Sequence, residues 1–326
     1  VNHPEDYITR SHVALTYHSG GRHAEAIDAY SKIVHDSSCL SDRNYVVYTT
    51  ALLFLGRSFM KSGDHERALE YMLKAQEVDP EYLLTKVSLA ELHIARGEYQ
   101  NSLVLAGQIV ASDPQLTFFP VDPVEITFSA HYLRAQAHHA LGQVEEAERE
   151  YRLAADQQAP RRTEALGNLA VLLKELDRRD ESLDVLRVAS KIDPENIKHD
   201  FNIGVHYLES GDLENARTQF KAVLDRRSDY RPATLNLGYI AKARGAFDEA
   251  EELYSELVAA APDEVEARAN LGHLYLDQER FLDARTAFEA LRLLDPKLLD
   301  INLGLLLAVA RLEDWVAVRQ LAQDVF

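Results

Sequence analysis

A short phrase built around an asparagine recurs in the chain at a fixed interval of 34 residues. It reads GNLA, FNIGVHY, LNLGYIA and ANLGHLY, and its asparagines are Asn168, Asn202, Asn236 and Asn270. A Gly or Ala stands two residues after each asparagine. A fixed period of this length indicates that each unit is one small motif that buries its apolar face only against its neighbours. The chain is therefore expected to form one elongated array of stacked units.

Weaker copies of the same pattern extend over nearly the whole chain, and two stretches interrupt it. The stretch 39–48 is an insertion whose apolar end is expected to lengthen the next helix. The stretch 115–127 carries two prolines and the pair Phe118–Phe119, and it keeps neither helical nor strand periodicity, so we expect a connector or a covering loop. The predicted units are 7–38, 49–82, 83–116, 128–162, 163–196, 197–230, 231–264, 265–298 and an incomplete unit 299–326.

The residue types within a unit predict two antiparallel helices. A Gly or Ala at position 8 and an Ala at position 20 would let the helices approach to roughly 8–10 Å, with a large residue at position 24 filling the space beside them. A Gly at position 15 suits a left-handed turn between the helices. A Pro near position 32 ends the second helix. These residues are expected to serve the architecture.

On these positions the chain resembles the tetratricopeptide repeat family. The resemblance covers everything except the two interruptions, and it implies an all-α fold, a right-handed α-solenoid of about nine helix-turn-helix units in a single superhelix over residues 1–326. In that family the first helices line an inner groove for peptide segments, and position 6 of each unit faces it. The four asparagines stand at position 6 here, and we call them the asparagine ladder. They resemble the ladder in the superhelix of O-linked N-acetylglucosamine transferase.

An asparagine amide both donates and accepts hydrogen bonds, so it can pair with a peptide group without reading the side chain. Units roughly 10 Å apart would meet about every third residue of an extended strand. The alternative is that the ladder reflects duplication of a sound unit, because asparagine is the commonest residue at that place in the repeat. The same register also turns Leu208 and Leu235 toward the groove, but for these two we favour packing between adjacent units. The predicted peptide-binding residues are Asn168, Asn202, Asn236, Asn270, Lys174, Phe201, Tyr239, Lys242 and His273.

The formal charge of −18 would repel phosphate backbones, so we expect no nucleic-acid partner and favour a basic or neutral peptide. The single cysteine, Cys39, excludes an internal disulfide and is compatible with the cytoplasm, which we predict as the location. The longest apolar run, Leu303 to Ala310, is too short to cross a bilayer, so no membrane span is expected.

Sequence motifs for catalysis are absent: there is no GxSxG, phosphate-binding glycine-rich loop or HExxH. His131, His138 and His139 are the densest histidine group, but no Cys or carboxylate joins them at the spacing of metal ligands. The Lys and Asn pairs of the family's carboxylate clamp are also missing. We therefore expect no cofactor, no metal and no catalytic residues.

Two functions remain open on the sequence. The first is a non-enzymatic scaffold that binds extended peptide segments of partner proteins in the groove, and this is the one we favour. The alternative is the substrate-recruiting region of a larger protein-modifying enzyme, such as a glycosyltransferase. The chain begins at Val1 and stops at Phe326 within an apparent helix, so we expect a further domain after Phe326.

Overall fold

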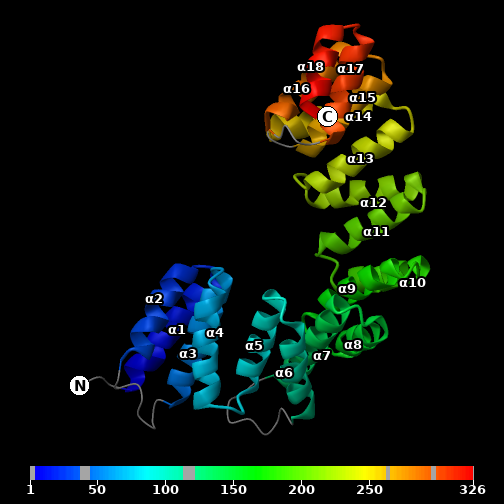
Figure 1. Ribbon diagram of the computed structural model, residues 1–326. Coiled ribbons are helices and arrows are strands. Elements are labelled where there is room, and N and C mark those ends of the chain that lie inside the picture. The colour runs from blue at the N-terminus through cyan, green and yellow to red at the C-terminus, as the bar shows by residue number, and fades with distance from the viewer. Residues whose placement is uncertain (1–3, 37–44, 113–121, 262–264, 295–298, 326) are drawn as a thin grey trace. The chain divides into compact units, whose positions relative to one another are not determined.

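The computed structural model describes residues 4–36, 45–112, 122–261, 265–294 and 299–325. These residues form eighteen α-helices and contain no strand (Figure 1). Taken in order, the helices make nine helix-turn-helix pairs, which confirms the predicted all-α solenoid. The chain divides into two compact units, 1–185 and 186–326, with the boundary inside one helix. A single superhelix over 1–326 stays a prediction.

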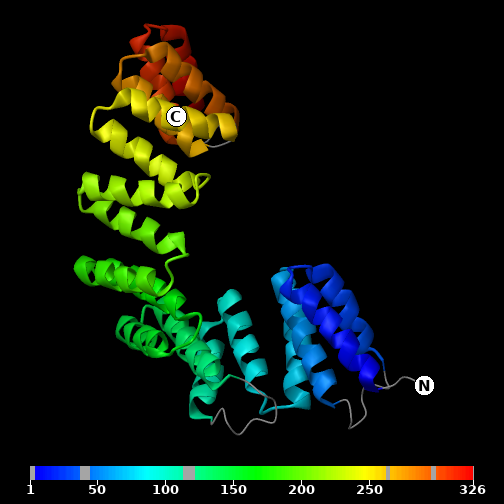
Figure 2. The same cartoon turned by 180° about the vertical axis from the view of Figure 1, so that it is seen from behind.

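The first compact unit consists of five helix pairs, the last of which it shares with the second unit. Its turns leave the two helices of each pair side by side (Figures 1 and 2). Large side chains such as Tyr30, Met72 and Tyr151 are buried between the helices. The helices are α1 Pro4–Ser19, α2 His23–Val34, α3 Tyr45–Lys61, α4 His65–Val78, α5 Leu83–Ala95, α6 Tyr99–Ala111, α7 Pro123–Ala140, α8 Val144–Asp156, α9 Arg162–Glu175 and α10 Arg179–Ile192.

The second compact unit contains four complete helix pairs after the end of α10. The buried rings of Phe220, Tyr254 and Phe288 all stand at position 24 of their pairs and form the centre of the local cores. The helices are α11 Ile197–Glu209, α12 Leu213–Arg226, α13 Arg231–Ala243, α14 Phe247–Ala260, α15 Val265–Asp277, α16 Phe281–Leu294, α17 Leu299–Arg311 and α18 Trp315–Val325.

Glycines at position 8 allow these rings to pack directly on the backbone of the first helix. A Cβ atom added at Gly238 would lie 2.5 Å from the ring of Tyr254, and one added at Gly204 would lie 2.7 Å from the ring of Phe220. Cβ atoms do not approach other carbons so closely, so only glycine fits. This confirms the predicted role of position 8.

Position 15 adopts the left-handed backbone that the sequence predicts, even in pairs that lack a glycine there. Gly245 has a φ of 76°. Asp177, Glu279 and Glu313, which replace glycine in three other pairs, have φ values of 57°, 58° and 57°. A side chain disfavours this region by roughly 1 kcal/mol. The backbone conformation of these three turns therefore has a small free-energy cost that the glycine turns avoid.

Replacing Glu279 by Gly is expected to raise the free energy of unfolding by about 0.5–1 kcal/mol, because the native turn loses its conformational cost. The reverse change, Gly245→Ala, should lower it by about 1 kcal/mol, since no atom lies within 4 Å of the added Cβ and only the backbone conformation opposes it. Urea denaturation of both variants measures the effects. A loss of stability in Glu279→Gly would contradict this account.

The starts of α3 and α7 bear on the two stretches that interrupt the repeat. Helix α3 begins at Tyr45, which confirms that the end of the 39–48 insertion extends the next helix. The predicted break at 115–127 is wrong at its end, because α7 begins at Pro123. A proline is well accommodated at the first helical position, and the Asp122 side chain accepts a hydrogen bond from the Val124 N–H at 2.9 Å. Phe118 and Phe119 lie outside the described residues.

Candidate peptide-binding groove

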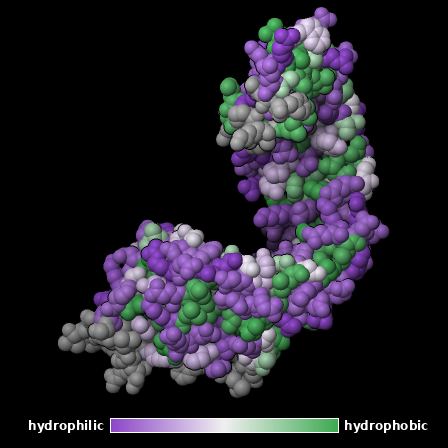
Figure 3. Space-filling view, viewed as in Figure 1, coloured by the Kyte–Doolittle hydropathy of each residue, from purple (hydrophilic) through white to green (hydrophobic). Residues whose placement is uncertain are grey.

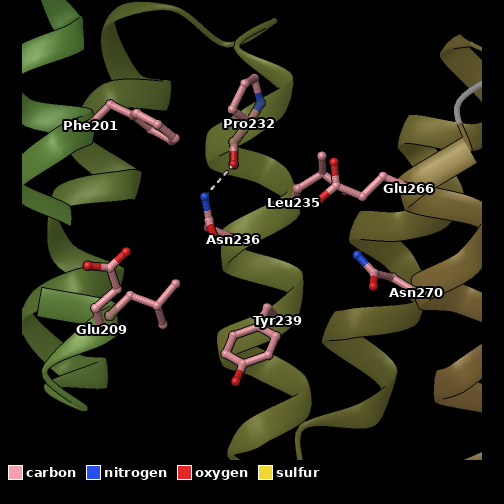
Figure 4. Close-up of a pocket in the computed structure, with 9 residues that line it drawn as sticks. Phe201, Glu209, Pro232, Leu235, Asn236, Tyr239, Glu266 and Asn270 are labelled. Atoms are coloured by element: carbon pink, nitrogen blue, oxygen red, sulfur yellow. Dashed lines mark hydrogen bonds between the residues drawn. The ribbon is translucent and has the colours of Figure 1, made fainter. Parts of the chain in front are cut away.

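A groove of about 720 Å³ lies within the second compact unit, along the first helices of three successive pairs. Helices α11, α13 and α15 supply its walls (Figure 4). Its surface combines apolar side chains, two amides and two carboxylates. The lining residues are Phe201, Leu208, Glu209, Pro232, Leu235, Asn236, Tyr239, Glu266 and Asn270.

Helical periodicity brings the lining residues of each wall together. Pro232, Asn236 and Tyr239 are spaced four and three residues apart, so they share one face of α13. The opposite side of α13 is fixed, because Gly238 packs against the Tyr254 ring of α14. On α15, Glu266 and Asn270 share a face in the same way. The repeat architecture therefore points this set of side chains into one groove.

The two groove amides keep most of their hydrogen-bonding capacity. Asn236 donates one hydrogen bond from Nδ2 to the carbonyl oxygen of Pro232, one helical turn earlier, at 2.9 Å (Figure 4). Its Oδ1 and its second N–H have no partner in the described part of the chain and can bond a ligand. Asn270 makes no hydrogen bond to any residue that the structure describes. Both amides can therefore bond a peptide group without first breaking a strong internal contact.

Of the residues predicted from the sequence, the groove brings together Phe201, Asn236, Tyr239 and Asn270. Tyr239 is the most accessible aromatic ring in it, with 54% of its surface exposed. Asn202 is half-buried on α11 and does not belong to the lining set. The assignment of these side chains to peptide binding stays a prediction.

Two other predicted residues of this unit contact carboxylates of the protein itself. The Lys242 ammonium lies 2.8 Å from an Asp277 carboxylate oxygen. His273 lies 3.1 Å from a carboxylate oxygen of Asp300, and its ring packs edge-on against Phe288. Neither lines the groove.

The remaining two predicted residues, Asn168 and Lys174, belong to α9 in the first compact unit. Asn168 is half-buried and donates a hydrogen bond from Nδ2 to the hydroxyl oxygen of Tyr132 at 2.8 Å. Lys174 is exposed near the end of the helix. Asn168 thus uses one of its amide hydrogens within its own unit, unlike Asn270.

Five of the lining residues are not among the predicted peptide-binding residues. Leu208 and Leu235 were expected to pack between units; both do pack against the neighbouring cores, and both also line the groove. Pro232 and Glu266 stand four residues before Asn236 and Asn270, so the helical period was a usable signal. Glu209, at the end of α11, carried no such signal.

The three clustered histidines of α7 have separate polar neighbours. His131 lies 2.7 Å from a carboxylate oxygen of Glu150, and His139 lies 2.8 Å from one of Glu175. His138 contacts the side-chain oxygen of Gln143 at 2.6 Å. Within the described ranges, no group of three or more His, Cys, Asp or Glu side chains is arranged to hold a metal ion.

Comparison with known families gives a consistent result. Four family models, each described as tetratricopeptide repeat, match residues 49–82, 129–152, 201–265 and 241–310. The first match has the same bounds as the second unit predicted from the sequence. None of the described helices is long and apolar enough to cross a membrane.

Two curated relatives match a large part of the chain. The "BBSome complex member BBS4 homolog" of Drosophila melanogaster is 23% identical over 228 residues, 69% of this chain. "Tetratricopeptide repeat protein 8" of Caenorhabditis elegans is 24% identical over 253 residues, 77% of this chain. In both cases the match spans 46% of the relative, so the chain covers about half the length of these proteins.

Solved structures with similar folds share little sequence with the chain. The APC/C hetero-tetramer Cut9–Hcn1 has a TM-score of 0.56 at 15% identity, covering 94% of this chain and 54% of that one. Pseudomonas aeruginosa PilF has a TM-score of 0.54 at 16% identity, covering 67% of this chain and 94% of that one. A tetratricopeptide repeat protein from Parabacteroides merdae has a TM-score of 0.54 at 14% identity, covering 80% and 98%. These similarities concern the fold alone.

Proposed function

The chain belongs to the tetratricopeptide repeat family, and from this premise we propose that it is a non-enzymatic scaffold that binds extended segments of partner proteins in the groove of α11, α13 and α15. Family membership supports a role in protein–protein interaction. The groove is the surface to which we assign this role.

The observation that carries the proposal is the pairing of available amides with accessible apolar surface in one groove. Asn236 and Asn270 stand on adjacent walls and can bond the backbone of an extended segment. Phe201 and Tyr239 offer rings against which side chains of that segment can pack. Backbone bonds that give affinity, combined with apolar contacts that give selectivity, are a common basis of peptide recognition.

The relatives support a role for this binding within a multi-protein complex. One of them is named as a member of the BBSome complex, and we infer that this chain likewise contacts other subunits of a multi-protein assembly. The single cysteine fits the reducing cytoplasm as the place of that assembly. The partner is a protein segment, and no nucleic acid or cofactor has a part in the proposed function.

Replacing both Asn236 and Asn270 by Ala is expected to weaken binding of an extended peptide about tenfold, since each lost backbone hydrogen bond contributes roughly 0.5–1.5 kcal/mol. The peptides are selected from a displayed peptide library for binding to the full chain. Their affinities are then measured by fluorescence polarisation. The melting temperature should stay nearly unchanged, because Asn236 bonds only a carbonyl of its own helix and both amides face the groove.

Asn202→Ala is the matched comparison for this experiment. Asn202 occupies the same repeat position but does not line the groove, so its loss should change the affinity by less than about twofold. The proposal is rejected if the double variant binds the selected peptides as tightly as the unchanged protein. An equal loss in Asn202→Ala would show that the groove extends further along α11 than its lining indicates.

A further inference from the structure

The charges of the groove are all of one sign. Its nine described lining residues include two carboxylates and no Lys, Arg or His. Glu209 comes from α11 and Glu266 from α15, on opposite sides of the α13 wall (Figure 4). An uncharged backbone ligand would not need either of them.

The lysine that the sequence placed in the groove is already engaged. Lys242 lies three residues beyond Tyr239 on α13, but its ammonium is directed to Asp277 at 2.8 Å. It does not line the groove. Glu266 has no ion pair with any residue that the structure describes. The negative charge on the α15 wall is therefore left to be balanced from outside.

The negative charge of Glu266 also acts on a side chain behind the groove. Burial is the main cause that raises the pKa of Tyr254 on α14, and the negative charge of Glu266 raises it further. The whole chain adds to this field, since it carries a formal charge of −18. Hydrophilic residues of either sign cover much of the face in Figure 3. Such a field attracts cationic ligands and repels anionic ones.

An exposed aromatic ring lines the same groove as the two carboxylates. The Tyr239 ring projects from α13 into the groove, which Glu209 lines from α11 and Glu266 from α15 (Figure 4). Aromatic rings attract ammonium and guanidinium groups through the negative potential of their faces. Two carboxylates beside an open ring are well matched to one long cationic side chain, whose methylene groups can pack on Phe201 and Leu235.

We propose that the partner segment carries a lysine or arginine side chain, whose charge lies against Tyr239 and is balanced by Glu209 and Glu266. This inference rests on the proposed function and adds the chemical class of the ligand. The amides of Asn236 and Asn270 hold the backbone, and the carboxylates select the side chain.

The test uses a set of peptides that differ at one position. They are extended Gly/Ser/Leu peptides of about twelve residues, a length that spans the three helices at ~3.3 Å per residue, with Lys, Arg, Gln or Glu at the centre. Fluorescence polarisation with the full chain should show the Lys and Arg peptides binding about tenfold more tightly than the Glu peptide, with Gln between them. The preference should shrink as salt is raised.

Variants then assign the preference to the groove. Glu266→Gln should weaken the Lys peptide about threefold and leave the Gln peptide unchanged, and Glu266→Lys should reverse the order of the Lys and Glu peptides. Glu252→Gln on α14 removes an exposed carboxylate away from the groove and serves as the control for the general field.

The outcomes separate the two proposals. Equal affinity for the Lys, Gln and Glu peptides, with a loss in the Asn236 and Asn270 double variant, would overturn the charge selection and leave peptide binding intact. If Glu252→Gln reduced the preference for Lys as much as Glu266→Gln does, the preference would come from the overall charge of the chain. That result would overturn the role of Glu266. Failure of every peptide to bind would overturn both.

Discussion

Replacing Glu150 by Ala is expected to lower the free energy of unfolding by about 3 kcal/mol, because it breaks a buried ionic cluster. Only 2% of the Glu150 side chain is exposed. Its carboxylate lies 2.7 Å from His131 Nδ1 and 3.0 Å from an Arg134 nitrogen, both on α7. Without the carboxylate, the Arg134 guanidinium is left partly buried and without this partner, and a cavity opens between α7 and α8.

Urea denaturation of the full chain measures the loss, and hydrogen exchange of α7 and α8 shows that it is local. Glu145→Ala is the matched control, since Glu145 is an exposed acid on the same helix and its removal should cost under about 0.5 kcal/mol. If the two variants were equally stable, the buried cluster would contribute nothing to folding.

The same cluster predicts a dependence on pH. Burial opposes ionisation of Glu150, but the hydrogen bond from His131 and the charge of Arg134 outweigh it, so the pKa of Glu150 is lowered. A carboxyl whose pKa is lower when folded stabilises the protein above its unfolded pKa, and this contribution is lost as the pH falls through the folded pKa. The stability gap between the unchanged protein and Glu150→Gln should therefore narrow from about pH 7 to about pH 3.

The sequence was sufficient for the helix pairs because the packing that defines them is repeated. Gly238 and Tyr254 stand sixteen residues apart, as do Gly204 and Phe220, and each such pair fixes one helix against the next. The start of α7 was missed for a local reason. Pro123 was taken as part of a break, although a proline also fits the first turn of a helix.

The groove was only partly predictable, for a different physical reason. Asn236 and Tyr239 follow from the period of one helix. Glu266 follows in the same way from Asn270 on α15, but Glu209 belongs to the groove only because α11 stands beside α13, and no local pattern states that. Lys242 was placed in the groove from its register alone, whereas its long side chain reaches a carboxylate of the next pair.

Replacing Gly272 by Val is expected to lower the free energy of unfolding by about 3 kcal/mol, because the ring it contacts cannot move away. A Cβ at Gly272 on α15 would lie 2.8 Å from the Phe288 ring. On α17, a Cβ at Gly304 would lie 2.6 Å from the same ring. Phe288 is fully buried, so its ring is held between two backbones and must distort the helices to make room.

Gly167→Val gives the matched control, because Gly167 lies within α9 and no atom is within 4 Å of an added Cβ. Valine has a slightly better helix propensity than glycine, so this variant should be neutral to within about 0.5 kcal/mol. Adding Phe288→Leu to Gly272→Val should recover part of the loss, since a smaller side chain makes room for the valine and the two effects then fail to add. Equal stability of the Gly272 and Gly167 variants in urea would mean that close contact at position 8 does not hold these helix pairs together.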